Sequence, residues 1–281
     1  MNILSKSILI KILIVISFIL FVFVYIYQDK IIGQIPIAYN YYQPINSKYL
    51  IETEQSKRII PHRVNSIGKL NDIWEEGFRS FECDVRFGDS NTKIFRMGHD
   101  IGEMGTDFES FLLSEDYEEI EKIWLDFKNL NSYNYKEALY ALNNLDEKYS
   151  LKKKLIVESG TKDNFFDQFS DNGYHTSYYL PTGLIKKLLK EKKSDEMISL
   201  AQNISKQTKL QKLSAISFYH EIYPFVKKFL EPRISKDIVY HIWYSPALYD
   251  NRFKSKLLNN ELYLNERVKT LLGTYRSQHN L

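Results

Sequence analysis

The sequence predicts an α/β fold, a (β/α)8 TIM barrel preceded by one N-terminal transmembrane helix. Short apolar stretches with strand periodicity alternate with amphipathic helical stretches, which is typical of a parallel sheet. A long apolar run stands at the amino terminus and is long enough to cross the hydrocarbon core of a bilayer. An open doubly wound sheet is the alternative, but no glycine-rich phosphate loop follows the first strand.

The apolar run at residues 7–27 predicts a membrane anchor. Lys11 and Ser17 are its only interruptions, and a helix that is apolar on every side needs protein or lipid all round it. Lys6 and Lys11 favour an amino terminus in the cytoplasm. A cleaved signal peptide is the rival, but bulky residues follow the run where small ones are expected. We therefore expect a single-pass membrane protein whose folded domain lies on the non-cytoplasmic side.

Three segments are predicted along the chain: a signal anchor at 1–30, a tether at 31–57 and the barrel domain at 58–281. The 38 basic residues nearly balance the 35 acidic ones and form no basic block, so nucleic acid is not an expected partner. Cys83 is the single cysteine and has no partner for an internal disulfide or a zinc site, so cysteine usage leaves the compartment open.

The barrel is predicted to begin with a short strand at 58–63, which ends in His62 and Arg63. An amphipathic helix at 67–77 follows and stops at a glycine. The next strand, 81–87, carries two carboxylates where apolar residues are expected.

Alternation along this second strand puts Glu82 and Asp84 on one face and apolar residues on the other. Neighbouring inward carboxylates repel each other and are costly to bury unless a cation neutralises them. A hard, oxygen-preferring divalent metal is the simplest such cation. The alternative is a solvated edge strand whose acids face water.

Further strands and helices are predicted in alternation. The strands lie at 93–97, 123–129, 154–158, 174–180, 215–219, 238–244 and 268–275, and the clearest helices at 108–121, 135–145, 184–206 and 224–230. Setting aside 93–97 as a short excursion leaves eight strands, the count of a closed barrel. Chemistry in such barrels gathers at the carboxyl ends of the strands. Asp126, Lys128 and Glu158 lie at or near such ends.

An ordered set of motifs resembles the glycerophosphodiester phosphodiesterase family and, more broadly, the phospholipase-C-like phosphodiesterases with TIM-barrel folds. The matched residues are His62 and Arg63, Glu82 and Asp84, His99 and Asp100, Asp126 and Lys128, and Trp243 as the aromatic of the seventh strand. Val64 stands where the family usually has glycine. Asp126 replaces the usual Glu, as in sphingomyelinase D and menorin-type relatives, and the latter also share the pair Asn65 and Ser66.

The carboxylates Glu82, Asp84 and Asp126 are expected to hold Mg²⁺ or Ca²⁺, because a metal neutralises the charge with which a phosphodiester repels nucleophiles. Arg63 and Lys128 are expected to hold phosphate oxygens. The resemblance implies that Trp243 contacts the substrate. The residues expected to contact and orient these metal-binding and substrate-binding side chains are Asn65, Asp100 and Glu158.

His62 and His99 are expected to act as acid and base, since imidazole titrates near neutral pH. The resemblance implies that a hydroxyl of the substrate attacks the phosphorus. Structural roles remain open: the histidines as capping or buried groups, and Lys128 as an internal ion-pair partner of Asp126.

Two functions follow from these residues. The first is metal-dependent hydrolysis, or intramolecular transphosphorylation, of a glycerol- or lipid-type phosphodiester by a membrane-anchored enzyme. The second is a noncatalytic barrel that binds a phosphorylated or glycan ligand at the membrane surface. Competent residues occupy the main catalytic positions, which favours the enzyme, although a fold alone never proves activity.

Overall fold

The structure is a computed structural model that describes residues 11, 13–20, 56–88, 92–102, 105–160, 163, 165–247, 261–275 and 277. The chain divides into two compact units, Met1–Ile45 and Asn46–Leu281. Residues 13–20 of the first unit are helical. Among the described residues, no helix has both the length and the apolar character needed to span a membrane. The transmembrane run expected at 7–27 and the tether at 31–57 fall mostly outside the described residues, so both stay predictions.

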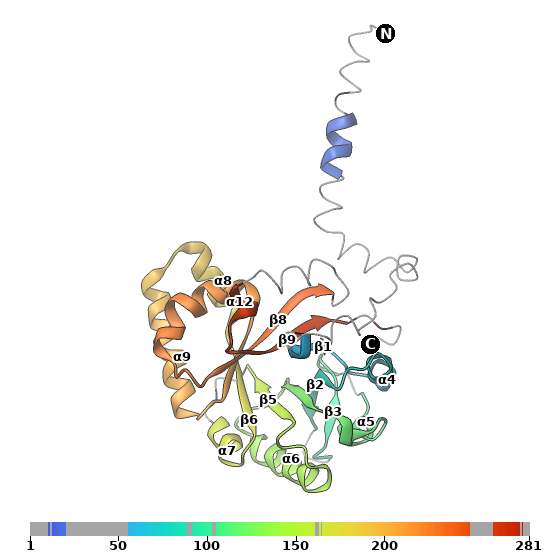
Figure 1. The fold of residues 1–281 in the computed structure, drawn as a ribbon. Coiled ribbons are helices and arrows are strands. Elements are labelled where there is room, and N and C mark those ends of the chain that lie inside the picture. Colours follow the sequence, from blue (N-terminus) through green and yellow to red (C-terminus); the bar gives the residue numbers. More distant parts are fainter. Residues whose placement is uncertain are drawn as a thin grey trace. The chain divides into compact units, whose positions relative to one another are not determined.

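One nine-stranded sheet organises the second unit (Figure 1). Its strands run in the order β1-β9-β8-β7-β6-β5-β4-β2-β3. Their bounds are β1 (Ile59–His62), β2 (Ser80–Phe87), β3 (Phe95–Met97), β4 (Lys122–Phe127), β5 (Leu155–Ser159), β6 (His175–Tyr179), β7 (Ala215–Tyr219), β8 (Val239–Ala247) and β9 (Val268–Thr274). Every neighbouring pair is parallel except β2 and β3, which are antiparallel.

The sheet curls until its first strand returns to its second. β1 pairs with β9 on one side, and directly after β1 the amide of Val64 donates to the carbonyl oxygen of Glu82 on β2 at 2.8 Å. Eight parallel strands in this cyclic arrangement are consistent with a (β/α)8 barrel. The predicted strand positions are confirmed, and so is the excursion after the second strand, which is β3.

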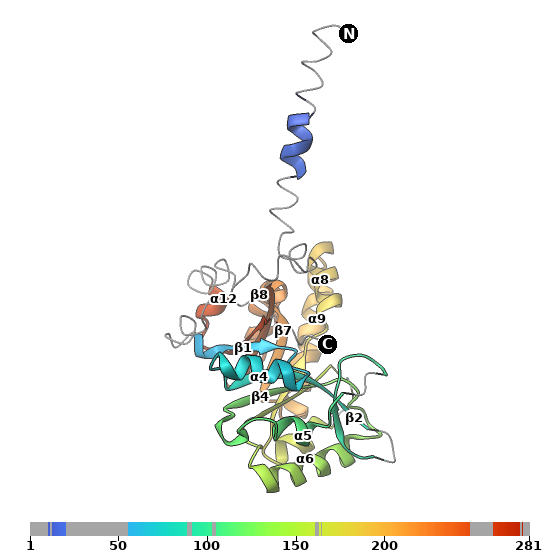
Figure 2. The ribbon, with the colours of Figure 1, turned by 90° about the vertical axis from the view of Figure 1, so that its right-hand side faces the viewer.

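Along the chain, helices follow most of the strands and connect each to the next (Figure 2). The longer ones are α4 (Ile67–Glu75), α6 (Tyr135–Tyr149), α8 (Thr182–Glu191) and α9 (Ser194–Leu210). Shorter elements are η1 (Ser56–Arg58), α5 (Phe108–Leu112), η2 (Tyr117–Glu119), α7 (Phe166–Asp171), η3 (His220–Ile222), α10 (Tyr223–Phe225), η4 (Val226–Leu230), η5 (Glu231–Arg233) and α12 (Glu261–Leu264).

Two predicted helices are interrupted. The stretch expected at 184–206 is two helices, because Lys192 takes a left-handed conformation with φ 56° and ends α8. The stretch expected at 108–121 stops at Leu112, and Asp116 then caps a separate short turn by accepting a hydrogen bond from the Glu118 amide.

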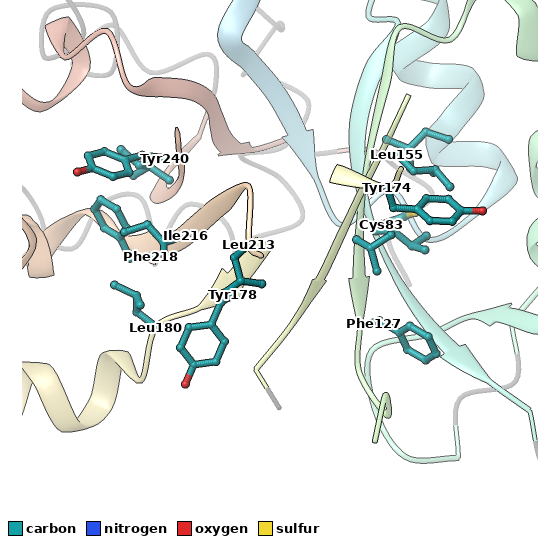
Figure 3. Packing of buried hydrophobic residues seen from close by; sticks show 14 of the residues in the cluster. Cys83, Phe127, Leu155, Tyr174, Tyr178, Leu180, Leu213, Ile216, Phe218 and Tyr240 are labelled. Carbon is teal, nitrogen blue, oxygen red and sulfur yellow. The ribbon is translucent and has the colours of Figure 1, made fainter. Parts of the chain in front are cut away.

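Two apolar clusters divide the core. The larger one lies between the sheet and its helices and contains the outward-facing side chains of β2 and β4, of which Cys83 and Phe127 are labelled in Figure 3. The smaller one lies inside the barrel and consists of Ile60, Trp124, Ile156 and Leu272, with Trp243 against it. The alternation predicted for the second strand therefore holds.

Candidate active site

A cavity of about 560 Å³ opens among the carboxyl ends of the strands. Its polar lining includes His62, Arg63, Glu82, His99, Asp126, Lys128, Glu158 and Ser159, and its apolar lining includes Trp124, Phe127, Tyr179, Trp243 and Leu272. The two strands that carry the carboxylates are neighbours, because β2 pairs with β4 so that Asp84 lies beside Asp126. Sequence positions far apart thus meet around one cavity.

Three carboxylates form a cluster at this cavity. Glu82, Asp84 and Asp126 each offer an oxygen atom, and these atoms lie within 4.8 Å of one another. Glu82 and Asp84 are buried, with 1% of each residue exposed. An all-oxygen set of this kind fits a hard divalent cation such as Mg²⁺ or Ca²⁺.

Burial and mutual repulsion act on the acids of the cluster. Burial raises the pKa of Glu82 well above its ordinary value, and the charges of Asp84 and Asp126 raise it further. Burial also raises the pKa of Asp126, although Lys128 opposes this shift. At Asp84 burial is outweighed by Lys128 and by a hydrogen bond from Asn65, so that pKa is lowered. The cluster thus holds more negative charge than its buried setting favours, and a cation relieves this cost.

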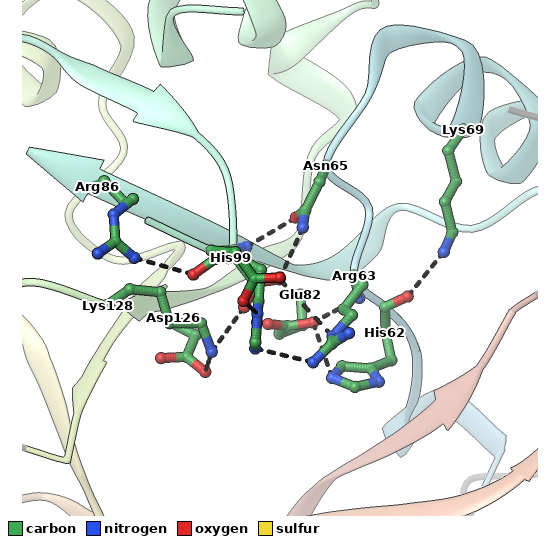
Figure 4. A network of polar contacts seen from close by, with 11 residues as sticks. His62, Arg63, Asn65, Lys69, Glu82, Arg86, His99, Asp126 and Lys128 are labelled. Atoms are coloured by element: carbon green, nitrogen blue, oxygen red, sulfur yellow. Dashed lines mark hydrogen bonds and ion pairs between the residues drawn. The ribbon is translucent and has the colours of Figure 1, made fainter. Parts of the chain in front are cut away.

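Lys128 supplies part of the compensating charge. Its Nζ lies 2.8 Å from Asp84 Oδ1 and 2.5 Å from Asp126 Oδ2 (Figure 4). The ion pair between Lys128 and Asp126 that was left open in the sequence is therefore present, and Asp84 belongs to it as well. These carboxylates raise the pKa of Lys128 against the effect of burial, so it stays charged.

His62 ends β1 at the edge of the acidic cluster. Its Nε2 lies 3.6 Å from Glu82 Oε2. Burial lowers the pKa of His62 to about 3, with Asp84 opposing the shift. The ring is therefore neutral near pH 7.

His99 reaches the same cavity from the segment after β3. The amide of Gly98 donates to the carbonyl oxygen of Asp84 at 3.0 Å, and Arg86 donates to the His99 carbonyl at 2.9 Å, which fixes this segment against β2. The Nε2 atom of His99 lies 2.8 Å from Arg63 Nη2, and Nδ1 lies 2.7 Å from Asp100 Oδ1. Arginine has no acceptor, so Nε2 must accept and Nδ1 carries the proton donated to Asp100.

Arg63 links the pieces of the site. It is a non-glycine residue with φ 56°, and this left-handed turn points its amide at Glu82 Oε2, 2.6 Å away. Its guanidinium contacts His99 and lies 3.9 Å from Asp84 Oδ2. Asn65 completes the turn: its Nδ2 donates to Asp84 Oδ2 at 2.7 Å, and its Oδ1 accepts from the Asp84 amide at 2.8 Å.

Glu158 and Trp243, which were also expected at the site, line the same cavity. Glu158 is buried on β5 beside Asp126, and Ser177 Oγ donates to its Oε2 at 3.2 Å. Burial, reinforced by Asp126, raises the pKa of Glu158 to about 8. Trp243 lines the cavity from β8, with its ring centroid 6.4 Å from that of His62.

Several site residues were not anticipated from the sequence. Lys69 is 5% exposed in α4, and its Nζ donates to the His62 carbonyl at 3.1 Å. Burial lowers the pKa of Lys69 to about 8, against the charge of Glu82. One feature of the sequence could have revealed Lys69: it lies one helical turn before Ile73, which is buried, so both residues share one face of the helix. Ser159 lines the cavity too, but it ends an ordinary-looking strand. Tyr179 also lines the cavity, and the sequence left two roles open for it: binding a sugar or lipid head group at the barrel mouth, or filling the barrel.

No protein-family model matches the sequence, and no curated protein matches it. Solved structures do match. A glycerophosphodiester phosphodiesterase from Parabacteroides distasonis has a TM-score of 0.53 at 12% identity, over 77% of this chain and 92% of that one. A protein from Galdieria sulphuraria assigned to the same activity has a TM-score of 0.51 at 12% identity, over 77% of this chain and 93% of that one.

The strand order and the position of the cavity define an α/β barrel with acids, bases and cationic groups at the carboxyl ends of its strands. More narrowly, the chain has the fold of the glycerophosphodiester phosphodiesterases. The expectation of that fold from the motifs is confirmed. The sphingomyelinase-D-like and menorin-like features stay predictions.

Proposed function

We propose that this protein is a metal-dependent phosphodiesterase acting on a glycerol- or lipid-type phosphodiester. The observation that carries the proposal is the meeting of His62, His99 and the three clustered carboxylates around one cavity in this fold. The described residues supply proton acceptors, proton donors and cationic groups within one space. Cleavage of a charged diester requires groups of these kinds.

The metal is proposed to be held by Glu82, Asp84 and Asp126. When bound, such an ion polarises a phosphoryl oxygen and neutralises charge on the substrate. The amide of Arg63 and the side chain of Asn65 hold the Glu82 and Asp84 carboxylates in place through the hydrogen bonds that they donate. Fixed carboxylates favour a fixed position for the ion.

The two histidines are proposed as the acid and base. One ring accepts the proton of the attacking hydroxyl, and the other protonates the leaving alkoxide. Asp100 orients His99 by accepting a hydrogen bond from its Nδ1–H group. Arg63 and Lys128 carry positive charge at the cavity and are proposed to bind the phosphoryl oxygens.

A noncatalytic barrel is the second candidate, and one observation favours it. The ammonium of Lys128 already pairs with two of the three clustered carboxylates, which reduces their need for a metal. In that case the cavity binds a phosphorylated or glycan ligand without turning it over.

Turnover and metal binding separate the two candidates. The full-length protein is assayed against glycerophosphodiesters and a chromogenic phosphodiester after chelation and after readdition of Mg²⁺ or Ca²⁺. We expect no turnover in chelator and recovery with one of the ions. Ligand binding by calorimetry without any turnover, at every metal concentration, would establish the binding barrel instead.

The proposal includes an anchored enzyme. The apolar run at 7–27 and the lysines before it support a single-pass membrane protein with its catalytic domain on the non-cytoplasmic side. Protease added to sealed cells or vesicles is expected to digest the barrel only from that side. Release of the protein by a high-salt wash would contradict the anchor.

A further inference from the structure

Three aromatic rings, those of Trp243, Tyr179 and Tyr219, lie together on β8, β6 and β7; we call them the aromatic wall. The ring centroids of Tyr219 and Trp243 are 4.7 Å apart, and those of Tyr179 and Trp243 are 6.3 Å apart. Tyr179 and Trp243 line the cavity itself. The proposed catalytic chemistry uses none of the three rings as acid, base or metal ligand.

The aromatic wall is held in position without a ligand. Lys186 Nζ lies over the Tyr219 ring, 4.1 Å from its centroid, and the same Nζ pairs with Glu221 at 2.7 Å. Tyr219 is thus contacted by Lys186 and by Trp243. Trp243 in turn packs against the apolar cluster inside the barrel. A preorganised ring surface of this kind loses little entropy when a ligand covers it.

Polar groups border the wall within the cavity. Glu158, Ser159 and Gly160, at the end of β5, line the cavity beside Tyr179. They present a carboxyl group, a hydroxyl group and backbone atoms next to the two ring faces. The Tyr179 and Trp243 rings are tilted by 39° to each other, and together with these hydrogen-bonding groups they match a ligand with an apolar face and hydroxyls around its edge.

We propose that Tyr179 and Trp243 bind the alcohol portion of the substrate, and that this alcohol is a polyhydroxylated ring, a sugar or a cyclitol. This inference rests on the proposed function and narrows its substrate. Tyr219 acts as a positioning residue that supports Trp243.

Two other occupants fit the wall less well. A quaternary ammonium group needs ring faces that surround an open space, whereas these rings pack against one another, and Arg63 and Lys128 in the same cavity repel a cation. An acyl chain needs a continuous apolar channel, whereas Glu158 and Ser159 interrupt this one.

The test compares diesters that share the glycerophosphoryl group and differ in the alcohol: inositol, glycerol and choline. The parent protein is expected to show a kcat/KM for the inositol diester at least ~10-fold above that for the other two, the worth of one or two aromatic contacts. Trp243→Leu and Tyr179→Ala are expected to remove this preference chiefly through KM. Tyr140→Ala, a change at a tyrosine that is 68% exposed on α6, serves as the matched control and should keep the preference.

Binding of inositol phosphate, measured by calorimetry, gives a readout that needs no catalysis. Affinity that falls at least ~10-fold in Trp243→Leu and Tyr179→Ala supports the ring site even if no diester is cleaved, in which case only the proposed function fails. Equal kinetic losses on the inositol and glycerol diesters would overturn the ring site. A parent preference for the choline diester would overturn it too, while leaving the phosphodiesterase in place.

Discussion

The two sides of the cavity are built by different forces. On the side of β1, β2 and β4, hydrogen bonds and ion pairs of 2.5 to 3.9 Å join Arg63 to His99 and Asp84, and Lys128 to Asp84 and Asp126. On the side of β6, β7 and β8, rings pack with centroids 4.7 to 6.3 Å apart. Polar contacts depend on individual atoms, whereas ring packing depends on area and shape. We therefore expect isosteric changes to be severe on the first side and mild on the second.

The largest effect is expected from the acidic cluster. Asp84→Asn should lower kcat by at least ~10⁴-fold, because a metal supplies several kcal/mol of charge stabilisation and the amide is a poor substitute for the carboxylate. Glu82→Gln and Asp126→Asn are expected to act in the same direction. Metal affinity by calorimetry and the circular dichroism of the folded protein are measured alongside.

Asp195→Asn, on the exposed first turn of α9, is the matched control and should leave both metal affinity and turnover unchanged. Normal metal binding in all three variants of the cluster would show that the metal site lies elsewhere.

The histidines come next. His62→Ala and His99→Ala are each expected to lower kcat by roughly 10²- to 10⁴-fold, the usual worth of a general acid or base, with little change in metal affinity. A diester with a good leaving group needs no proton donor, so it should rescue whichever variant lacks the acid. Rates near those of the parent in both variants would remove the acid and base mechanism.

A smaller effect is expected from Lys69, which contacts the site only through the His62 carbonyl and its own charge. Lys69→Met should lower kcat by ~10-fold, as is common for residues that contact the groups of a site without touching the substrate or the metal. The pH profile of kcat should shift as well, because a positive charge near Glu82 is lost. A change in KM alone, with an unmoved pH profile, would limit Lys69 to packing.

The last prediction concerns stability in the absence of metal. Glu158 has an ordinary pKa of 4.5 and a folded pKa of about 8, so between these values the folded state binds more protons and stability falls as pH rises. His62 and His175 have lowered pKa values and act in the opposite direction, but only below their ordinary value of 6.5. Above about pH 6.5 these histidines therefore no longer oppose the loss of stability that Glu158 causes as pH rises.

In chelator, the Tm of the parent should fall by a few degrees between about pH 6.5 and pH 8, and Glu158→Gln should flatten this slope. Added metal should raise the Tm more at the upper end of this range, because ionised carboxylates bind it better. An identical slope in parent and variant would place the titrating group elsewhere.

The sequence predicted the charged side better than the aromatic side. Strand alternation is enough to place Glu82, Asp84 and Asp126 on the inner face, and the carboxyl ends of parallel strands meet at one rim. Tyr179 and Tyr219 carry no such signal, because a tyrosine at a strand end fills a barrel equally well in any sequence. Which rings meet depends on the register between β6, β7 and β8.

Unusual backbone conformations were the other feature that could not be predicted from the sequence. Nothing in the identity of Arg63 or Lys192 indicates a left-handed φ, since neither is glycine or asparagine, yet one aims an amide at Glu82 and the other ends α8. Helix α7 was missed because six residues are too few for a clear period.

The pairing of β1 with β9 ties the two ends of the folded domain together. His62 lies opposite Thr274 in this pairing, so the strand that carries one of the proposed catalytic groups is bordered by the last strand of the barrel in sequence order. A nascent chain that has exposed residues up to the end of β8 holds all of the carboxylates and rings of the site but lacks β9, the partner of its first strand. We therefore expect the cavity to stay incomplete until β9 has formed and paired with β1.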